Sequence, residues 1–224
     1  MRPSWIGAVL ILVVTACGHR PAPTPPVLPS SSAHLGAVKP ANIKRVVAKL
    51  PPGYEVTTGI PSGASPRLIR GLEAAHMRIE PPRCGALADP GNAHNHSAQG
   101  ISGSGAGGVV DSVVVALPGP VNLDHNLVAG CARWTMTAGH TKAVVRLTDA
   151  PHIDGAETLG MVADIRSSVE SGAQIDSRAN TFTAYLGDYY AFTTLTTDPG
   201  SAQPALPPRV AADLLVETVS TLRS

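Results

Sequence analysis

Histidine is the residue type in this chain best suited to metal chemistry, and two of the eight histidines stand almost side by side. His94 and His96 form an H-x-H pair in the polar stretch "GNAHNHSAQG". Such a pair binds Zn²⁺ or Cu²⁺ when a third and a fourth ligand complete the site. No neighbouring residue has the spacing of a further ligand. We therefore interpret both as solvated loop residues, and we keep an extracytoplasmic metal-binding protein that uses them as an alternative.

A glycine motif raises the question of a nucleotide cofactor. Gly103, Gly105 and Gly108 form G-x-G-x-x-G, a pattern that holds a pyrophosphate where a strand precedes it and a helix follows it. The residues after Gly108 read "VVDSVVVAL", and valine favours strands over helices. We therefore predict no cofactor here. We expect a β-hairpin in which Ser104 and Val109 flank the reversal of the chain.

Hydrolase chemistry finds little support in the sequence. A serine nucleophile in the strand-to-helix elbow needs G-x-S-x-G, and "GISGSGAGG" lacks the closing glycine in that register. His152 and Asp154 lie two residues apart on an expected turn, where we interpret them as loop polar groups. We therefore predict no catalytic residues, and we keep a hydrolase of envelope esters or glycans as a further alternative.

The first residues are typical of an exported lipoprotein. Arg2 precedes a short apolar run, which is too short to span a bilayer as a helix. The run ends in "VTAC", which resembles a bacterial lipobox, with small residues before Cys17. We predict that residues 1–16 are a signal peptide and that Cys17 is lipidated. Several acyl chains on one residue anchor a protein stably, so we expect it on the outer side of the plasma membrane, with that membrane as its first partner.

The rest of the chain divides by composition. Residues 17–41 are rich in proline and serine, as in a polyproline-like spacer. Residues 42–224 are long enough for a single domain with a sizeable core. The formal net charge is +1 and there is no basic stripe, so we do not expect nucleic acid as a partner.

Two cysteines remain besides Cys17. In an oxidising compartment outside the cytoplasm, Cys84 and Cys131 are expected to pair as a disulfide. A metal-binding pair or a catalytic thiol remains the alternative use of these two residues.

Hydrophobic periodicity predicts helices at the beginning, middle and end of this domain. Asn42 is a candidate N-cap, and Ile43, Val46, Val47 and Leu50 then have the spacing of one helical face before Pro51. A helix over 122–131, with Asn122 as its N-cap, is also expected. A last helix is expected after Pro207-Pro208, with a buried apolar stripe of Ala211, Leu214, Leu215, Val219 and Leu222. The stretches between them favour successive antiparallel strands. The fold class is therefore α+β, an antiparallel β-sheet packed by N-terminal, middle and C-terminal helices.

The segments "SGSGAGGVVDSVVV", "PHIDGAETLGM" and the last fifty or so residues, from "VESGAQIDSRANTF" onward, carry a resemblance. They resemble a family of mycobacterial envelope lipoproteins that have one domain of unknown function. The layout is similar to the extracellular sensor domain of PknH-type Ser/Thr kinases. This resemblance implies a lipid-anchored, non-catalytic binding domain, whose ligand is an unidentified envelope lipid, glycan or protein.

Overall fold

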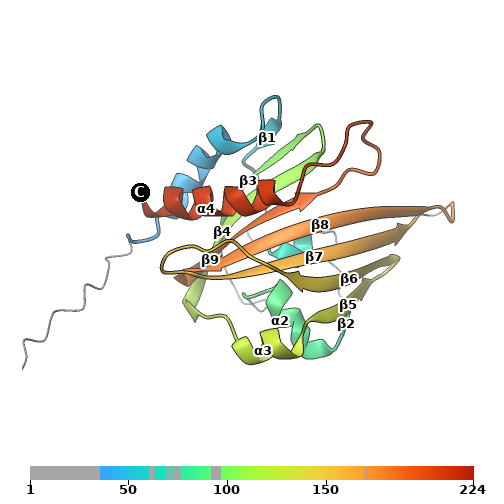
Figure 1. The fold of residues 1–224 in the computed structure, drawn as a ribbon, viewed down its shortest axis with the longest axis horizontal. Helices are drawn as coiled ribbons and strands as arrows, with labels where there is room; N and C mark the ends of the chain where they lie inside the picture. Colours follow the sequence, from blue (N-terminus) through green and yellow to red (C-terminus); the bar gives the residue numbers. More distant parts are fainter. Residues whose placement is uncertain (1–35, 61–63, 70–71, 73–76, 92–96, 170) are drawn as a thin grey trace, which may run out of the picture. The chain divides into compact units, whose positions relative to one another are not determined.

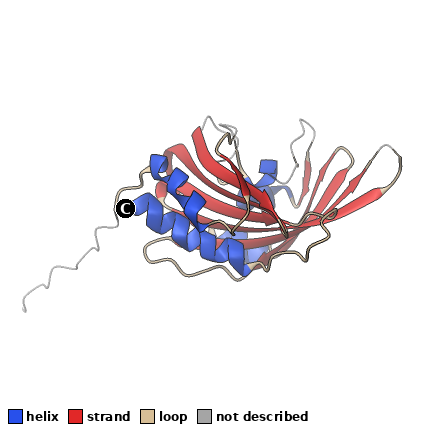
Figure 2. Ribbon diagram, turned by 90° about the horizontal axis from the view of Figure 1, so that it is seen from above, coloured by secondary structure: helices blue, strands red, loops and turns tan. Residues whose placement is uncertain are grey.

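The fold is built on one nine-stranded antiparallel sheet, in the order β1-β3-β4-β9-β8-β7-β6-β5-β2 (Figure 1). It is taken from a computed structural model, which describes residues 36–60, 64–69, 72, 77–91, 97–169 and 171–224. The strands are β1 Glu55–Thr57, β2 Arg78–Glu80, β3 Ser97–Gly105, β4 Gly108–Val121, β5 Arg133–Ala138, β6 Thr141–Thr148, β7 Glu157–Ser168, β8 Gln174–Tyr185 and β9 Gly187–Thr196. Seen from above, the sheet is a strongly bent layer (Figure 2).

The helical segments are short except at the two ends of the domain. They are the 3₁₀ helices η1 Pro40–Lys49 and η2 Pro82–Cys84, and the α-helices α1 Pro66–Ile69, α2 Gly85–Ala88, α3 His125–Gly130 and α4 Arg209–Arg223. Within the described ranges, no helix is long and apolar enough to cross a membrane. The predicted combination of an antiparallel sheet with helices is therefore present, although the sheet dominates.

One side of the sheet is covered by η1 and α4, which pack on each other and on β3, β4, β8 and β9. The alternation of side chains along β4 points Val110, Ser112 and Val114 toward this side. Ser112 Oγ lies 2.8 Å from Thr218 Oγ1 of α4, and both residues are buried. The apolar stripe predicted for the C-terminal helix is buried in this layer, at Ala211, Leu214, Leu215, Val219 and Leu222.

The opposite side of the sheet holds a second core under η2, α2 and α3. Trp134 and Met136 of β5 face it, together with alternate residues of β6, β7 and β8. Most of the apolar side chains on this side of β5 to β8 belong to the core, and the next residue along each strand points the other way.

Two of the predicted helices differ from the structure at their starts. The middle helix begins after Asp124, not Asn122, because the Asp124 carboxylate accepts hydrogen bonds from the backbone N–H groups of Asn126 and Leu127. The N-terminal helix starts at Pro40 and is a 3₁₀ helix, in which Ile43 and Val46 are buried as expected.

The glycine-rich stretch forms the predicted hairpin between β3 and β4. Ser104 pairs with Val109, and Gly105 pairs with Gly108. Gly107 and Gly108 have φ values of 92° and 138°, which suit glycine at the reversal. A strand follows the motif, so no helix N-terminus is available to hold a pyrophosphate.

Candidate functional site

The residues first suspected of chemistry do not form a site within the described part of the chain. Cys17, His94 and His96 lie outside the described residues, so lipidation and the metal-binding alternative stay predictions. His152 and Asp154 lie on an exposed loop with their Nε2 and Oδ1 atoms 3.2 Å apart. In the described ranges, no group of three or more His, Cys, Asp and Glu side chains is arranged to hold a metal ion.

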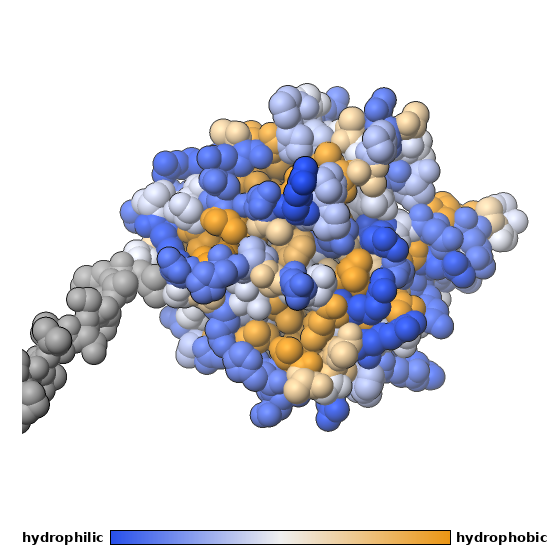
Figure 3. Space-filling view, in the orientation of Figure 1, coloured by the Kyte–Doolittle hydropathy of each residue, from blue (hydrophilic) through white to orange (hydrophobic). Residues whose placement is uncertain are grey.

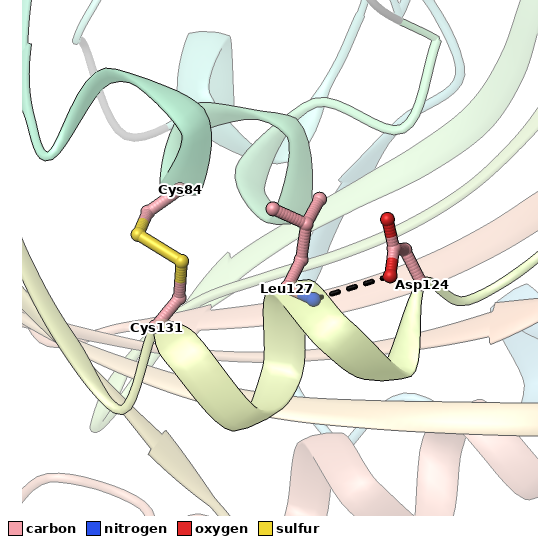
Figure 4. The surroundings of a disulfide bond; sticks show 4 residues. All are labelled: Cys84, Asp124, Leu127 and Cys131. Carbon is pink, nitrogen blue, oxygen red and sulfur yellow. Dashed lines mark hydrogen bonds between the residues drawn. A yellow bond between two sulfur atoms is a disulfide. The ribbon is translucent and has the colours of Figure 1, made fainter.

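The two domain cysteines form the expected disulfide. Cys84 and Cys131 are fully buried and covalently joined, 47 residues apart in sequence. The bond ties η2 and α2 to the C-terminal end of α3, and the Asp124 carboxylate caps the other end of that helix (Figure 4). The disulfide therefore has a structural role, because it fixes short helical segments that are too short to be stable in isolation.

A charged groove lies on the other side of the same strands, where η1 and α4 do not cover the sheet. Its hollow of about 580 Å³ is lined by Lys142, Val144, Asp164, Ile165, Arg166, Asp176, Ser177, Arg178 and Thr197. We call this hollow the charged groove. It is the feature of the described structure best suited to hold a ligand, since concave sites with converging polar groups are typical binding sites.

Strand pairing explains why the charges converge. Lys142 of β6 lies opposite Arg166 of β7, and Arg166 lies opposite Asp176 of β8. Two residues along the strands, Asp164 lies opposite Arg178. Because residues directly opposite share a face, three strands bring these five side chains to one surface.

Ion pairs hold the arginine side chains of the groove in place. Asp164 accepts hydrogen bonds from Arg146 Nη2 at 2.7 Å and from Arg178 Nε at 2.8 Å. Asp176 accepts from Arg166 Nε at 2.7 Å, and this contact raises the pKa of Arg166 and lowers the pKa of Asp176. These side chains are about half exposed, so solvent screens each pair and the pairs add little to stability. Their main effect is to orient the guanidinium groups.

Several donors of the groove keep their capacity to bind an anion. Arg166 uses Nε and one Nη group for Asp176. Arg178 uses Nε for Asp164, and none of the hydrogen bonds between described residues involves its two Nη groups. A guanidinium has five N–H donors, so these arginines retain free donors beside the hollow.

The surface around the groove carries a positive excess. The face formed by β2, β5, β6, β7 and the start of β8 bears six cations and three carboxylates, as the strand register places them: Arg78, Arg133, Lys142, Arg146, Arg166 and Arg178, with Glu80, Asp164 and Asp176. Figure 3 shows strongly hydrophilic residues gathered over the outer ends of these strands. The whole chain has a formal net charge of only +1, so this face is locally enriched in positive charge.

A comparison with protein families matches residues 39–223 to the family described as "Domain of unknown function (DUF5642)". The chain belongs to the DUF5642 family. This match confirms the expected membership of a family with one domain of unknown function. It includes every described strand and helix of the DUF5642 domain, from η1 to α4.

Two solved structures are similar to this DUF5642 chain. The first is an Rv0999 ortholog from Mycobacterium smegmatis, with 18% identity, a TM-score of 0.62, and coverage of 84% of this chain and 98% of that chain. The second is the extracellular domain of PknH from Mycobacterium tuberculosis, with 14% identity, a TM-score of 0.45, and coverage of 82% and 99%. A search of curated proteins found no match. The first similarity shows a shared fold.

Sequence reasoning missed the charged groove of the DUF5642 domain. The signal was present in "KAVVR", "ADIR" and "QIDSR", where charged residues alternate with apolar or small ones. Alternation of this kind indicates one solvated face per strand. Only the register of β6, β7 and β8 shows that the solvated faces of the three strands lie on the same side of the sheet.

Proposed function

We propose that this protein is an exported, lipid-anchored envelope protein whose folded domain binds a partner and does not transform it. The observation that carries the proposal is the charged groove, an open hollow in which arginine side chains are already oriented by Asp164 and Asp176. Pre-oriented donors reduce the entropy lost on binding, which suits a recognition surface. Within the described residues, the groove holds no serine, cysteine or histidine paired with a base.

The anchoring part of the proposal rests on the sequence and is supported by the disulfide. Residues 1–16 act as the signal peptide, Cys17 carries the lipid, residues 17–41 form the spacer and residues 42–224 form the binding domain. The Cys84–Cys131 bond fits this location, because disulfides persist in oxidising compartments outside the cytoplasm. The domain then faces away from the cytoplasm on the outer side of the plasma membrane.

Metabolic labelling with an alkyne fatty acid tests the anchor in the native host. We expect the wild-type chain to carry the label and to sediment with membranes. C17A is expected to lose the label. The double variant C84A/C131A, which removes the two disulfide-bonded cysteines, is expected to keep it. An unlabelled wild-type chain, or a labelled C17A chain, would refute the lipid anchor.

A further inference from the structure

We propose that the charged groove binds a phosphate monoester of a sugar or another small polyol. This inference rests on the binding function proposed above and names the chemical class of the ligand. The phosphate group would lie between Lys142, Arg166 and Arg178, and the esterified group would occupy the rest of the hollow.

Strand pairing places these three cations around one part of the sheet. Lys142 of β6 lies directly opposite Arg166 of β7, and Arg178 lies on β8 two residues beyond the partner of Arg166. Neighbouring strands are about 4.8 Å apart, so long side chains from β6 and β8 can meet above β7, the strand between them. All three residues are exposed on the same side of the sheet and line the same hollow.

Each of the three side chains has N–H groups that are not used within the described structure. Arg166 donates Nε and Nη2 to Asp176, which leaves Nη1, and Arg178 donates Nε to Asp164, which leaves both Nη groups. No described residue forms an ion pair with Lys142. An anion can therefore contact all three side chains without breaking an existing ion pair. The two guanidinium groups are already held in place, which reduces the entropy lost on binding.

The arrangement of these donors favours a phosphate over a carboxylate. A carboxylate presents two coplanar oxygens, which a single guanidinium satisfies, as Asp176 and Arg166 show within the groove itself. The free donors instead come from three side chains on three strands, which suits the three terminal oxygens of a phosphate monoester.

The local charge also matches that of a phosphate monoester. In and beside the hollow, the cations exceed the carboxylates by two: the cations are Lys142, Arg146, Arg166 and Arg178, and the carboxylates are Asp164 and Asp176. A phosphate monoester carries a charge of about −1.5 to −2 at pH 7, so it would balance this excess. A carboxylate or a sulfate ester, with one negative charge, would leave part of it unbalanced.

The size and lining of the groove indicate what the phosphate is attached to. The hollow of about 580 Å³ is as large as typical small-molecule sites, and a phosphate group alone would fill only a small part of it. Thr197 Oγ1 accepts the backbone N–H of Arg178, so its own hydroxyl hydrogen can be donated to a ligand. The carboxylates of Asp164 and Asp176 retain lone pairs that can accept hydrogen bonds from hydroxyl groups. These groups suit a ligand part that is rich in hydroxyls, such as a sugar or glycerol.

Isothermal titration calorimetry with glucose 6-phosphate tests the proposal. The protein is residues 17–224 carrying C17S, which retains the whole compact unit His34–Ser224 but cannot be lipidated. We expect glucose 6-phosphate to bind and unmodified glucose not to bind. Glucose 6-sulfate and glucuronate should bind at least about threefold more weakly, because each carries a smaller charge. Absence of binding by glucose 6-phosphate and by glycerol 1-phosphate at millimolar concentration would overturn the proposal, and so would binding of glucuronate as tight as that of glucose 6-phosphate.

Matched charge variants locate the binding site. K142Q/R178Q removes one lysine and one arginine from the groove and should raise the Kd for glucose 6-phosphate by at least about tenfold. The control K44Q/R209Q removes one lysine and one arginine that are exposed on η1 and α4, and it should change the Kd by less than about threefold. Circular dichroism checks that both variants are folded. Equal changes in Kd for the two folded double variants would refute the assignment to the groove.

A competition experiment distinguishes a free phosphate monoester from one carried by a lipid. Vesicles of phosphatidylcholine with phosphatidic acid present the same phosphate monoester at a surface. Displacement of glucose 6-phosphate by these vesicles would assign the groove to a lipid-linked monoester, and absence of displacement would assign it to a soluble one. The Cys17 labelling experiment is independent of these titrations. A labelled chain that binds no phosphate monoester would refute the ligand and leave the anchor, and an unlabelled chain that binds one would refute only the anchor.

Discussion

Replacement of Asp111 by Asn should make the protein more stable at neutral pH. Asp111 lies on β4, and only 5% of its surface is exposed. Burial raises the pKa of its carboxyl group from 3.8 to about 6, and a hydrogen bond from the Ser102 side chain offsets part of this rise. The charged carboxylate is therefore disfavoured in the folded state, and an uncharged amide of the same shape avoids this penalty.

The sign of the pH dependence follows from the direction of the shift. Between pH 3.8 and about 6 the folded state binds more protons than the unfolded state, so the stability contribution of Asp111 falls as pH rises. The loss is complete above pH 6. A difference of about two pKa units corresponds to about 3 kcal/mol, which is the expected gap between D111N and the wild type at neutral pH. Below pH 3.8 the carboxyl is protonated in both states and the gap should close.

Urea unfolding at pH 3.5 and pH 7.5 measures this difference directly. D149N serves as the control because Asp149 is exposed, and it should change the free energy of unfolding by less than about 0.5 kcal/mol at either pH. The reasoning fails if D111N is less stable than the wild type at pH 7.5. It also fails if the gap between them is the same at both pH values.

Three further predictions test the packing of the domain by urea unfolding. C84A/C131A should lower the free energy of unfolding by about 4 kcal/mol, since the disulfide closes a loop of 47 residues; a loss below about 1 kcal/mol would contradict a structural role. T218V leaves the Ser112 hydroxyl buried without its partner and should cost about 1–3 kcal/mol, part of which S112A/T218V should recover; no recovery would refute the pairing. G108A should lower stability by more than about 1 kcal/mol, because its φ is 138° and an added Cβ would lie 2.3 Å from the Thr196 carbonyl oxygen; a neutral effect would contradict the hairpin geometry.

The elements with strong periodicity were predictable from the sequence because local pattern determines them. The C-terminal helix has its apolar residues at helical spacing, and all five expected core positions are buried. The hairpin between β3 and β4 followed from glycines next to a valine-rich run. The middle helix was placed too early because Asn122 and Asp124 are both good N-caps, and only the structure shows which one bonds to the helix.

The candidate site was not predictable in the same way, because it depends on the register between neighbouring strands and not on a pattern within any one strand. Lys142 of β6 and Arg178 of β8 are separated by two chain reversals and share one face only because both strands pair with β7. A shift of one residue in either register would move these charges to the other side of the sheet. By contrast, His152 and Asp154, whose side chains could take part in catalysis, lie on an exposed loop. They are close in space only because they are two residues apart in sequence.

The position of the groove follows from how much sheet two helices can cover. A helix about 10 Å wide covers about two strands that are 4.8 Å apart, so η1 and α4 together cover about four strands. They pack on β3, β4, β9 and β8, which leaves the same side of β7, β6, β5 and β2 open to solvent. Solubility requires these open strands to be polar, and neutral threonine or serine would satisfy that requirement. The open strands instead carry an excess of arginine and lysine, and carboxylates orient the guanidinium groups. This arrangement goes beyond what solubility requires. It is the physical reason for proposing that the uncovered half of the sheet binds a ligand.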